Sequence, residues 1–242
     1  MAKLFKANHG RRVELEGVGP AARPVDIDQA QTGFAVLRTL RIYHFEPPAV
    51  IRGHAEEDEV YIVVLEGEIE LQMRSEHWSS SESRFTLEAV DRSESIACAA
   101  YLPPHTEYLL TPRSGADVAY ARALPTQSRP PALFFTSPDR CNSGPRLLLD
   151  PSAYADRLRL QLWYAEADEN AADLAPAAHS PARSETLIHV RSTPARAVTV
   201  DARGLSGMTL DSWDTIGLSA GEWPMLRVAA RSSAMSLIVS AA

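Results

Sequence analysis

The chain has 242 residues, of which 45% are hydrophobic and 23% charged, the composition of an ordinary globular protein that can bury a core. Its formal net charge of −7 and its scattered basic residues argue against nucleic acid as a main partner, because phosphate binding needs basic stripes. No apolar run approaches the roughly 18 residues of a membrane span, and no secretory signal is recognisable, so we expect a cytoplasmic protein without membrane contact. Cys98 and Cys141 lie far apart and lack paired spacing, which predicts buried free thiols.

The first half of the chain is predicted to fold into short antiparallel strands. The first thirty residues, with Gly17, Gly19, Pro20 and Pro24, are typical of an arm of short strands and turns. Many short strands separated by Pro and Gly favour an antiparallel barrel or sandwich. Further strands are expected at residues 34–43, 60–65, 69–71, 85–87, 94–102, 107–110 and 116–123.

The stretch Gly53 to Leu71 is the most informative part of this half. An acidic entry, residues 56–59, leads into the apolar strand 60–65, and a glycine turn leads into the alternating residues 69–71. The first strand is apolar on both faces, so we expect it to be buried on both, whereas the second is expected to face solvent on one side. The acidic run itself is expected to be a solvated edge that discourages pairing with other chains.

The second half repeats the pattern of the first. Residues 126–150 are rich in proline and predict a crossover linker with a short strand at 132–135. In both halves an apolar strand leads to a polar loop with a histidine, two more strands, a turn and a closing strand, which indicates two barrels, 1–125 and 151–242. The strands expected in the second are 157–164, 186–190, 197–200, 214–218 and 235–239.

Five short segments, taken in order, resemble one protein family over nearly the full length. The segments are Glu59-Val-Tyr-Ile-Val-Val-Leu-Glu-Gly-Glu, Arg92-Ser-Glu-Ser-Ile, Pro104-His-Thr-Glu-Tyr-Leu-Leu, Ser184-Glu-Thr-Leu-Ile-His-Val and Ala220-Gly-Glu-Trp-Pro. With them the chain resembles the bicupins of the 5-deoxyglucuronate isomerase group, which includes the deoxy-hexosulose-uronate ketol-isomerases. The resemblance implies an all-β bicupin, with two antiparallel cupin-like (jelly-roll) barrels in one chain, and an aldose-ketose isomerase of inositol or uronate catabolism.

In that family the second barrel holds a divalent metal with three histidines and one glutamate, which can orient the oxygens of a sugar substrate. Carried over to this sequence, the pattern keeps His179 and Glu185 as metal and catalytic residues. The other two ligand positions fall on Ala177 and Trp223, so half of the set is lost. His189 follows Glu185 by four residues on an expected strand and should share its face, which makes it a candidate substitute ligand.

The first barrel offers fewer ligands. His54 and Glu56 take the places of a histidine pair and Tyr108 that of the closing histidine, but Val60 stands where the glutamate belongs and Glu59 is one residue out of phase. A metal is therefore not expected in this barrel.

Two functions follow from these observations. One is an isomerase acting on a sugar acid with Mn, Fe, Ni or Zn at His179, Glu185 and His189, where an arginine such as Arg183 or Arg227 could pair with the substrate carboxylate. The other is a non-catalytic ligand-binding or assembly bicupin that has lost the metal site, with Trp223 filling the former cavity. A homodimer is expected in either case, because cupin barrels often pair through sheet edges.

Overall fold

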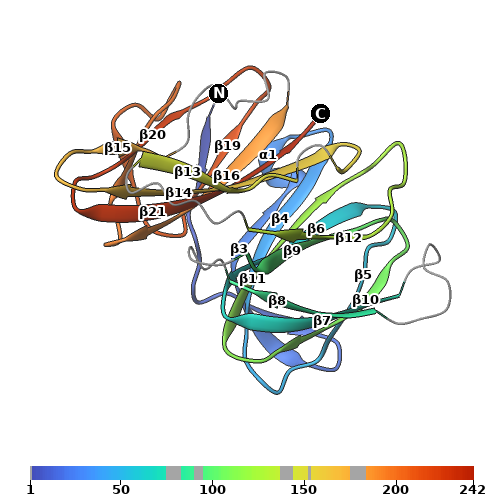
Figure 1. Ribbon diagram of the computed structural model, residues 1–242. Helices are drawn as coiled ribbons and strands as arrows, with labels where there is room; N and C mark the ends of the chain where they lie inside the picture. Colours follow the sequence, from blue (N-terminus) through green and yellow to red (C-terminus); the bar gives the residue numbers. More distant parts are fainter. Residues whose placement is uncertain (1, 75–82, 90–94, 137–143, 152–153, 175–183) are drawn as a thin grey trace.

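In the part of the chain that the structure describes, four antiparallel sheets form the framework of the protein (Figure 1). The computed structural model describes residues 2–74, 83–89, 95–136, 144–151, 154–174 and 184–242. Each half of the chain contributes one larger and one smaller sheet, and the single helix of these residues is the short α1 (Gln29–Thr32). The prediction of an all-β fold is confirmed. None of the described helices is long and apolar enough to cross a membrane.

The first half forms a seven-stranded sheet that faces a four-stranded sheet. The larger has the order β12-β9-β6-β11-β4-β3-β2, and the smaller has the order β5-β10-β7-β8. The strands of the larger are β2 (Arg12–Leu15), β3 (Gly19–Asp28), β4 (Leu37–Phe45), β6 (Glu59–Glu66), β9 (Ala97–Leu102), β11 (Ala116–Ala123) and β12 (Ala132–Phe135). Those of the smaller are β5 (Ile51–His54), β7 (Glu68–Arg74), β8 (Ser83–Glu88) and β10 (Glu107–Pro112).

The second half forms a six-stranded sheet, β1-β19-β16-β21-β14-β13, and a four-stranded sheet, β15-β20-β17-β18. Strand β1 comes from the start of the chain and pairs with β19, so the first residues complete a sheet of the opposite half (Figure 1). The larger sheet contains β1 (Lys3–Phe5), β13 (Gly144–Leu149), β14 (Leu158–Ala167), β16 (Glu185–Thr193), β19 (Thr215–Leu218) and β21 (Ser232–Ala241). The smaller contains β15 (Ala172–Asp173), β17 (Val198–Asp201), β18 (Met208–Leu210) and β20 (Met225–Val228).

The same strand order occurs in both halves. The run β9-β6-β11-β4-β3 of the first corresponds to β19-β16-β21-β14-β13 of the second, and β5-β10-β7-β8 corresponds to β15-β20-β17-β18. The internal repeat seen in the sequence is therefore a repeat of sheet topology.

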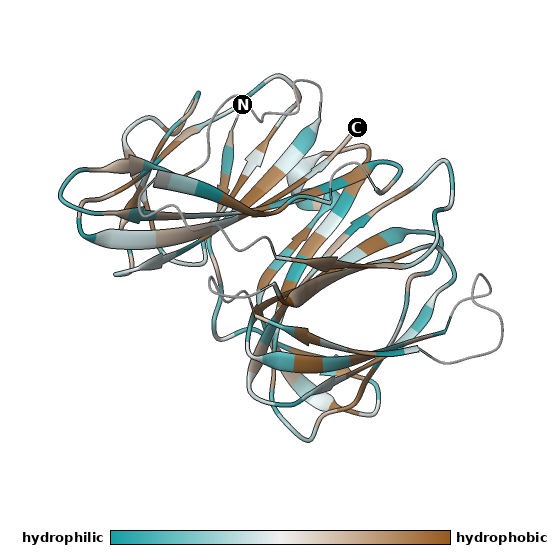
Figure 2. Ribbon diagram, in the orientation of Figure 1, coloured by the Kyte–Doolittle hydropathy of each residue, from teal (hydrophilic) through white to brown (hydrophobic). Residues whose placement is uncertain are grey.

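Strand β6 is buried on both faces, as its sequence predicts. Alternate residues point to opposite sides of a strand, so Ile62 packs in the core between the two sheets of the first half, while Tyr61 and Val63 pack against the second half. Leu160 of β14 and Leu187 of β16 belong to that same inter-half cluster, so the two larger sheets pack face to face. The hydropathy colouring shows these apolar segments along the inner strands (Figure 2).

The acidic run of the first half differs from expectation. The acidic run at 56–59 is not wholly solvated, because Asp58 is 3% exposed and Glu59 is fully buried. Both side chains find partners in segments distant in sequence, which the sequence pattern alone does not reveal. Cys98 is buried and free, as predicted, whereas Cys141 lies outside the described residues.

Candidate functional site

Glu185, a predicted metal ligand, lies at the first position of β16 and points toward the first half of the chain. Its carboxylate accepts the backbone N–H groups of Ala35, Val36 and Leu37 at 2.5, 2.8 and 2.9 Å. These three residues lead into β4, so Glu185 fixes the start of a strand in the opposite half. Both carboxylate oxygens are engaged by backbone donors.

His189 shares the face of Glu185, and this face packs against the first half of the chain. The imidazole is 1% exposed, and its Nδ1 lies 3.2 Å from Oγ1 of Thr215. Burial lowers the pKa of His189 to about 3, with a smaller contribution from the charge of Arg191, so the ring is neutral at physiological pH. Its neighbours Ile188 and Val190 point the other way, into the core between the two sheets of the second half.

The remaining predicted positions do not complete a metal site in the described part of the chain. His179, Ala177 and Arg183 fall outside it. Trp223 is partly buried and packs against the core of the second half. This packing agrees with a side chain that fills space in the barrel. Arg227 pairs at 3.6 Å with Asp173 on the exposed sheet surface. Glu185 and His189 face away from that core, and no group of three His, Cys, Asp or Glu side chains suited to a metal occurs among the described residues. The described members of the predicted set therefore do not fit a metal ion as a group; coordination by His179 stays a prediction.

Glu59 occupies the corresponding position at the start of β6 and makes the reciprocal contact. Its carboxylate accepts the backbone N–H groups of Asp156, Arg157 and Leu158 at 3.0, 2.8 and 2.5 Å, just where β14 begins. The hydroxyl of Tyr101 also donates to it at 3.1 Å. Burial raises the pKa of Glu59, and the backbone donors oppose that rise.

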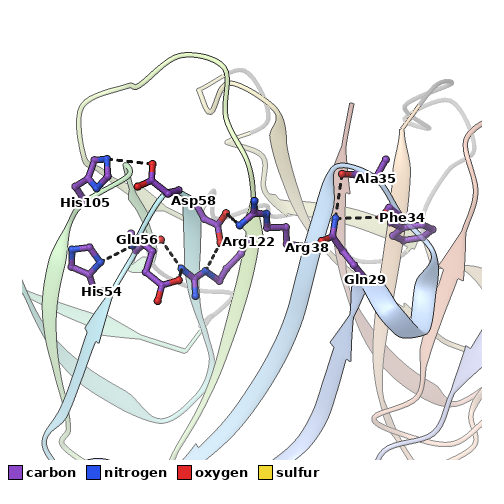
Figure 3. A network of polar contacts seen from close by, with 11 residues as sticks. Gln29, Phe34, Ala35, Arg38, His54, Glu56, Asp58, His105 and Arg122 are labelled. Carbon is purple, nitrogen blue, oxygen red and sulfur yellow. Dashed lines mark hydrogen bonds and ion pairs between the residues drawn. The ribbon is translucent and has the colours of Figure 1, made fainter.

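The other motif-like residues of the first half form an ion-pair network (Figure 3). Asp58 lies between two guanidinium groups, with Nη1 of Arg38 at 2.9 Å and Nε of Arg122 at 3.0 Å. Burial raises the pKa of Asp58, while Arg122 and Arg38 act in the opposite direction. Nδ1 of His54 accepts the backbone N–H of Glu56 at 2.8 Å, so the two residues in the place of a histidine pair bind each other.

Val60 and Tyr108, which stand at two ligand positions of the motif, both pack inside this half. Val60 packs in the apolar core between the sheets. The ring of Tyr108 covers Gly53, where an added Cβ would lie 2.1 Å from Cζ of the tyrosine. His105 and Glu107, beside the motif, are exposed.

A pocket that the sequence does not single out lies over the smaller sheet of the first half. It has a volume of about 510 Å³ and is formed by neighbouring residues of β5, β7 and β10. Its two arginines are Arg52 and Arg74. Nothing in the sequence marks β5 and β7 as the two strands that flank β10, so the sequence gives no signal that these side chains share a face. The lining residues are Arg52, Gly53, His54, Gln72, Met73, Arg74, Glu107, Tyr108 and Leu109.

Comparison with known proteins gives structural matches only. No protein-family model and no curated protein matches the chain. The crystal structure of an IolB-like protein from Salmonella typhimurium has a TM-score of 0.66 at 17% identity, covering 99% of this chain and 92% of that one. The bacterial pirin YhhW from Escherichia coli, solved in complex with nickel(II), has a TM-score of 0.61 at 15% identity, covering 100% of this chain and 99% of that one.

A third match is named for the fold itself. A cupin 2 conserved barrel domain protein from Leptotrichia buccalis has a TM-score of 0.55 at 11% identity, covering 99% of this chain and 96% of that one. At such low sequence identities, structural similarity shows the fold of the chain but not its activity. The chain is therefore an all-β protein with the cupin fold.

Proposed function

We propose that this chain is a non-catalytic cupin that binds a small molecule and whose motif carboxylates hold its two halves together. The observation that carries the proposal is the contact of Glu185 with three consecutive backbone N–H groups of the opposite half. A metal-binding carboxylate needs its lone pairs for the ion, and here backbone donors take them.

The packing of the second half supports the same function. Trp223 stands at a family ligand position and packs on the apolar core, so this space is filled by an indole. His189, the candidate substitute ligand, is turned toward the first half and bound to Thr215. These roles stabilise the fold and leave ligand binding to another surface.

The binding site of this proposal is the pocket over β5, β7 and β10. Its volume of about 510 Å³ lies within the usual range for small-molecule sites, roughly 300–1,000 Å³. It combines charged groups with the apolar surface of Leu109, the mixture that gives orientation as well as affinity.

A sugar-acid isomerase is the second candidate, and the likeness to the IolB-like protein favours it. In that case His179 would join Glu185 at a divalent metal, and Glu185 would have to release the backbone of residues 35–37. A homodimer and a cytoplasmic location stay predictions from the sequence under both candidates.

Thermal-shift screening of chelator-treated protein against a panel of charged and neutral metabolites tests the proposal. We expect at least one compound to raise the melting temperature without added metal, and no conversion of a uronic acid to its ketose in an NMR assay with Mn, Fe, Ni or Zn. Metal-dependent conversion that a Glu185→Gln variant loses would show that the isomerase candidate is right.

A further inference from the structure

The charged side chains of the pocket over the smaller sheet of the first half project from one face of that sheet. In the register of this sheet, Arg52 lies opposite Leu109, and Arg74 lies opposite Glu107. Because residues two apart share a face, all four side chains project from the same face of the sheet. Met73 precedes Arg74 on β7 and so points to the opposite face. It is 1% exposed and belongs to the core, so the face shared by the four side chains is the outer one.

Arg52 and Arg74 are arranged to meet one ligand. They lie on β5 and β7, the two strands that flank β10, and their positions are offset by two residues. With strands about 4.8 Å apart and a rise of about 3.4 Å per residue, their Cα atoms are about 12 Å apart. Two long guanidinium side chains reaching inward over β10 can span that distance.

Neither guanidinium forms an ion pair within 4 Å with a residue that the structure describes. On the same sheet, by contrast, Arg84 lies 3.2 Å from Glu70, which Arg113 also pairs with. Glu107 is the acidic residue of the pocket, so the two arginines leave one positive charge in excess. This excess occurs in a chain whose net charge is −7.

We propose that this pocket binds a small organic oxyanion, a carboxylate or a phosphate ester, whose charged end pairs with Arg52 and Arg74 and whose apolar body lies against Leu109. Guanidinium groups match both oxyanions because they offer parallel N–H donors in a fixed plane. The inference rests on the proposed binding function and adds the chemical class of the ligand.

Isothermal titration of the full chain with matched probes tests it. Benzoate is compared with benzamide, and phenyl phosphate with phenol, while inorganic phosphate shows whether the charged end suffices. We expect saturable binding of benzoate, phenyl phosphate or both, with the neutral partner at least tenfold weaker. The arm that binds tells whether carboxylate or phosphate is the natural group.

Variants locate the binding. Arg52→Gln and Arg74→Gln should each weaken anion binding by about 10- to 100-fold, the usual effect of losing a charge-assisted hydrogen bond. Arg84→Gln is the matched control, since it removes the same charge from the same sheet outside the pocket, and its affinity should equal that of the wild type.

Three results would overturn the assignment: no saturable anion binding, equal binding of the neutral probes, or equal weakening by Arg84→Gln. A neutral ligand that binds the metal-free protein would leave the proposed binding function intact and refute only the oxyanion. Metal-dependent isomerisation, together with anion binding that needs Arg52, would refute the proposed function and keep the pocket.

Discussion

Glu59 and Glu185 each bind three consecutive backbone N–H groups at the start of a strand of the opposite half. Glu59 binds the N–H groups of residues 156–158 before and at the start of β14, and Glu185 binds those of residues 35–37 before and at the start of β4. Since β6 and β16 correspond in the topological repeat, as do β4 and β14, the two contacts are equivalent. Together they tie the halves to each other across the interface.

Replacing either glutamate should destabilise the protein. Glutamine has one oxygen in place of two, and its amide group meets N–H donors, so buried donors lose their acceptor. We expect Glu59→Gln to lower the free energy of unfolding by about 3 kcal/mol and Glu185→Gln, which is less buried, by about 2 kcal/mol. Urea denaturation measures both. The control Glu88→Gln, exposed on β8, should change it by less than about 0.5 kcal/mol; equal values for all three variants would refute the clamp.

Acid should destabilise the fold through His189. Its pKa is lowered to about 3 in the folded state and is about 6.5 in an unfolded chain, so the unfolded state binds the proton more readily between these values. Stability due to His189 is therefore complete above pH 6.5 and is lost as pH falls toward 3, by up to about 1.4 kcal/mol per pH unit.

A His189→Asn variant should show a smaller loss of unfolding free energy between pH 7 and pH 5 than the wild type, in urea denaturation at both values. His105→Asn, which alters an exposed histidine, should keep the slope of the wild type. If His189→Asn keeps it too, the imidazole is not the buried neutral group described above.

The ion pair between Arg191 and Asp117 should contribute to the docking of the two halves. Nη2 of Arg191 on β16 lies 2.6 Å from Oδ2 of Asp117 on β11, and Asp117 is 4% exposed. Arg191→Gln leaves that carboxylate with His44 as its remaining side-chain partner, and we expect a loss of about 3 kcal/mol in unfolding free energy. Arg227→Gln, whose exposed pair with Asp173 measures 3.6 Å, should change it by less than about 0.5 kcal/mol. Urea denaturation measures the unfolding free energy of both variants, and thermal denaturation their melting temperatures. Equal losses in Arg191→Gln and Arg227→Gln would contradict this prediction.

Regular alternation made the longer strands predictable. The strand expected at residues 116–123 has the observed bounds of β11, and the doubly apolar run at 60–65 lies inside β6. Short strands such as β5 and β15 carry too few residues to show a period. The pairing of β1 with β19 joins residues more than 200 positions apart, so no local pattern could indicate it.

The site was harder to predict because its residues change role with their surroundings. The sequence places Glu185 and His189 on one strand face, and the structure has them there, but it turns that face toward the other half. Glu59 is one residue out of phase with the metal motif, and for that reason its side chain points across the interface between the halves. Arg52 and Arg74 came together only through the order β5-β10-β7, which the sequence does not specify.

Metal analysis of protein purified without chelators tests the central claim most directly. If Glu185 is a structural clamp, Mn, Fe, Ni and Zn should each be far below one per chain, in the wild type and in Glu185→Gln alike. Near-stoichiometric metal in the wild type that is lost in both Glu185→Gln and His179→Ala would contradict the account and restore these residues as ligands.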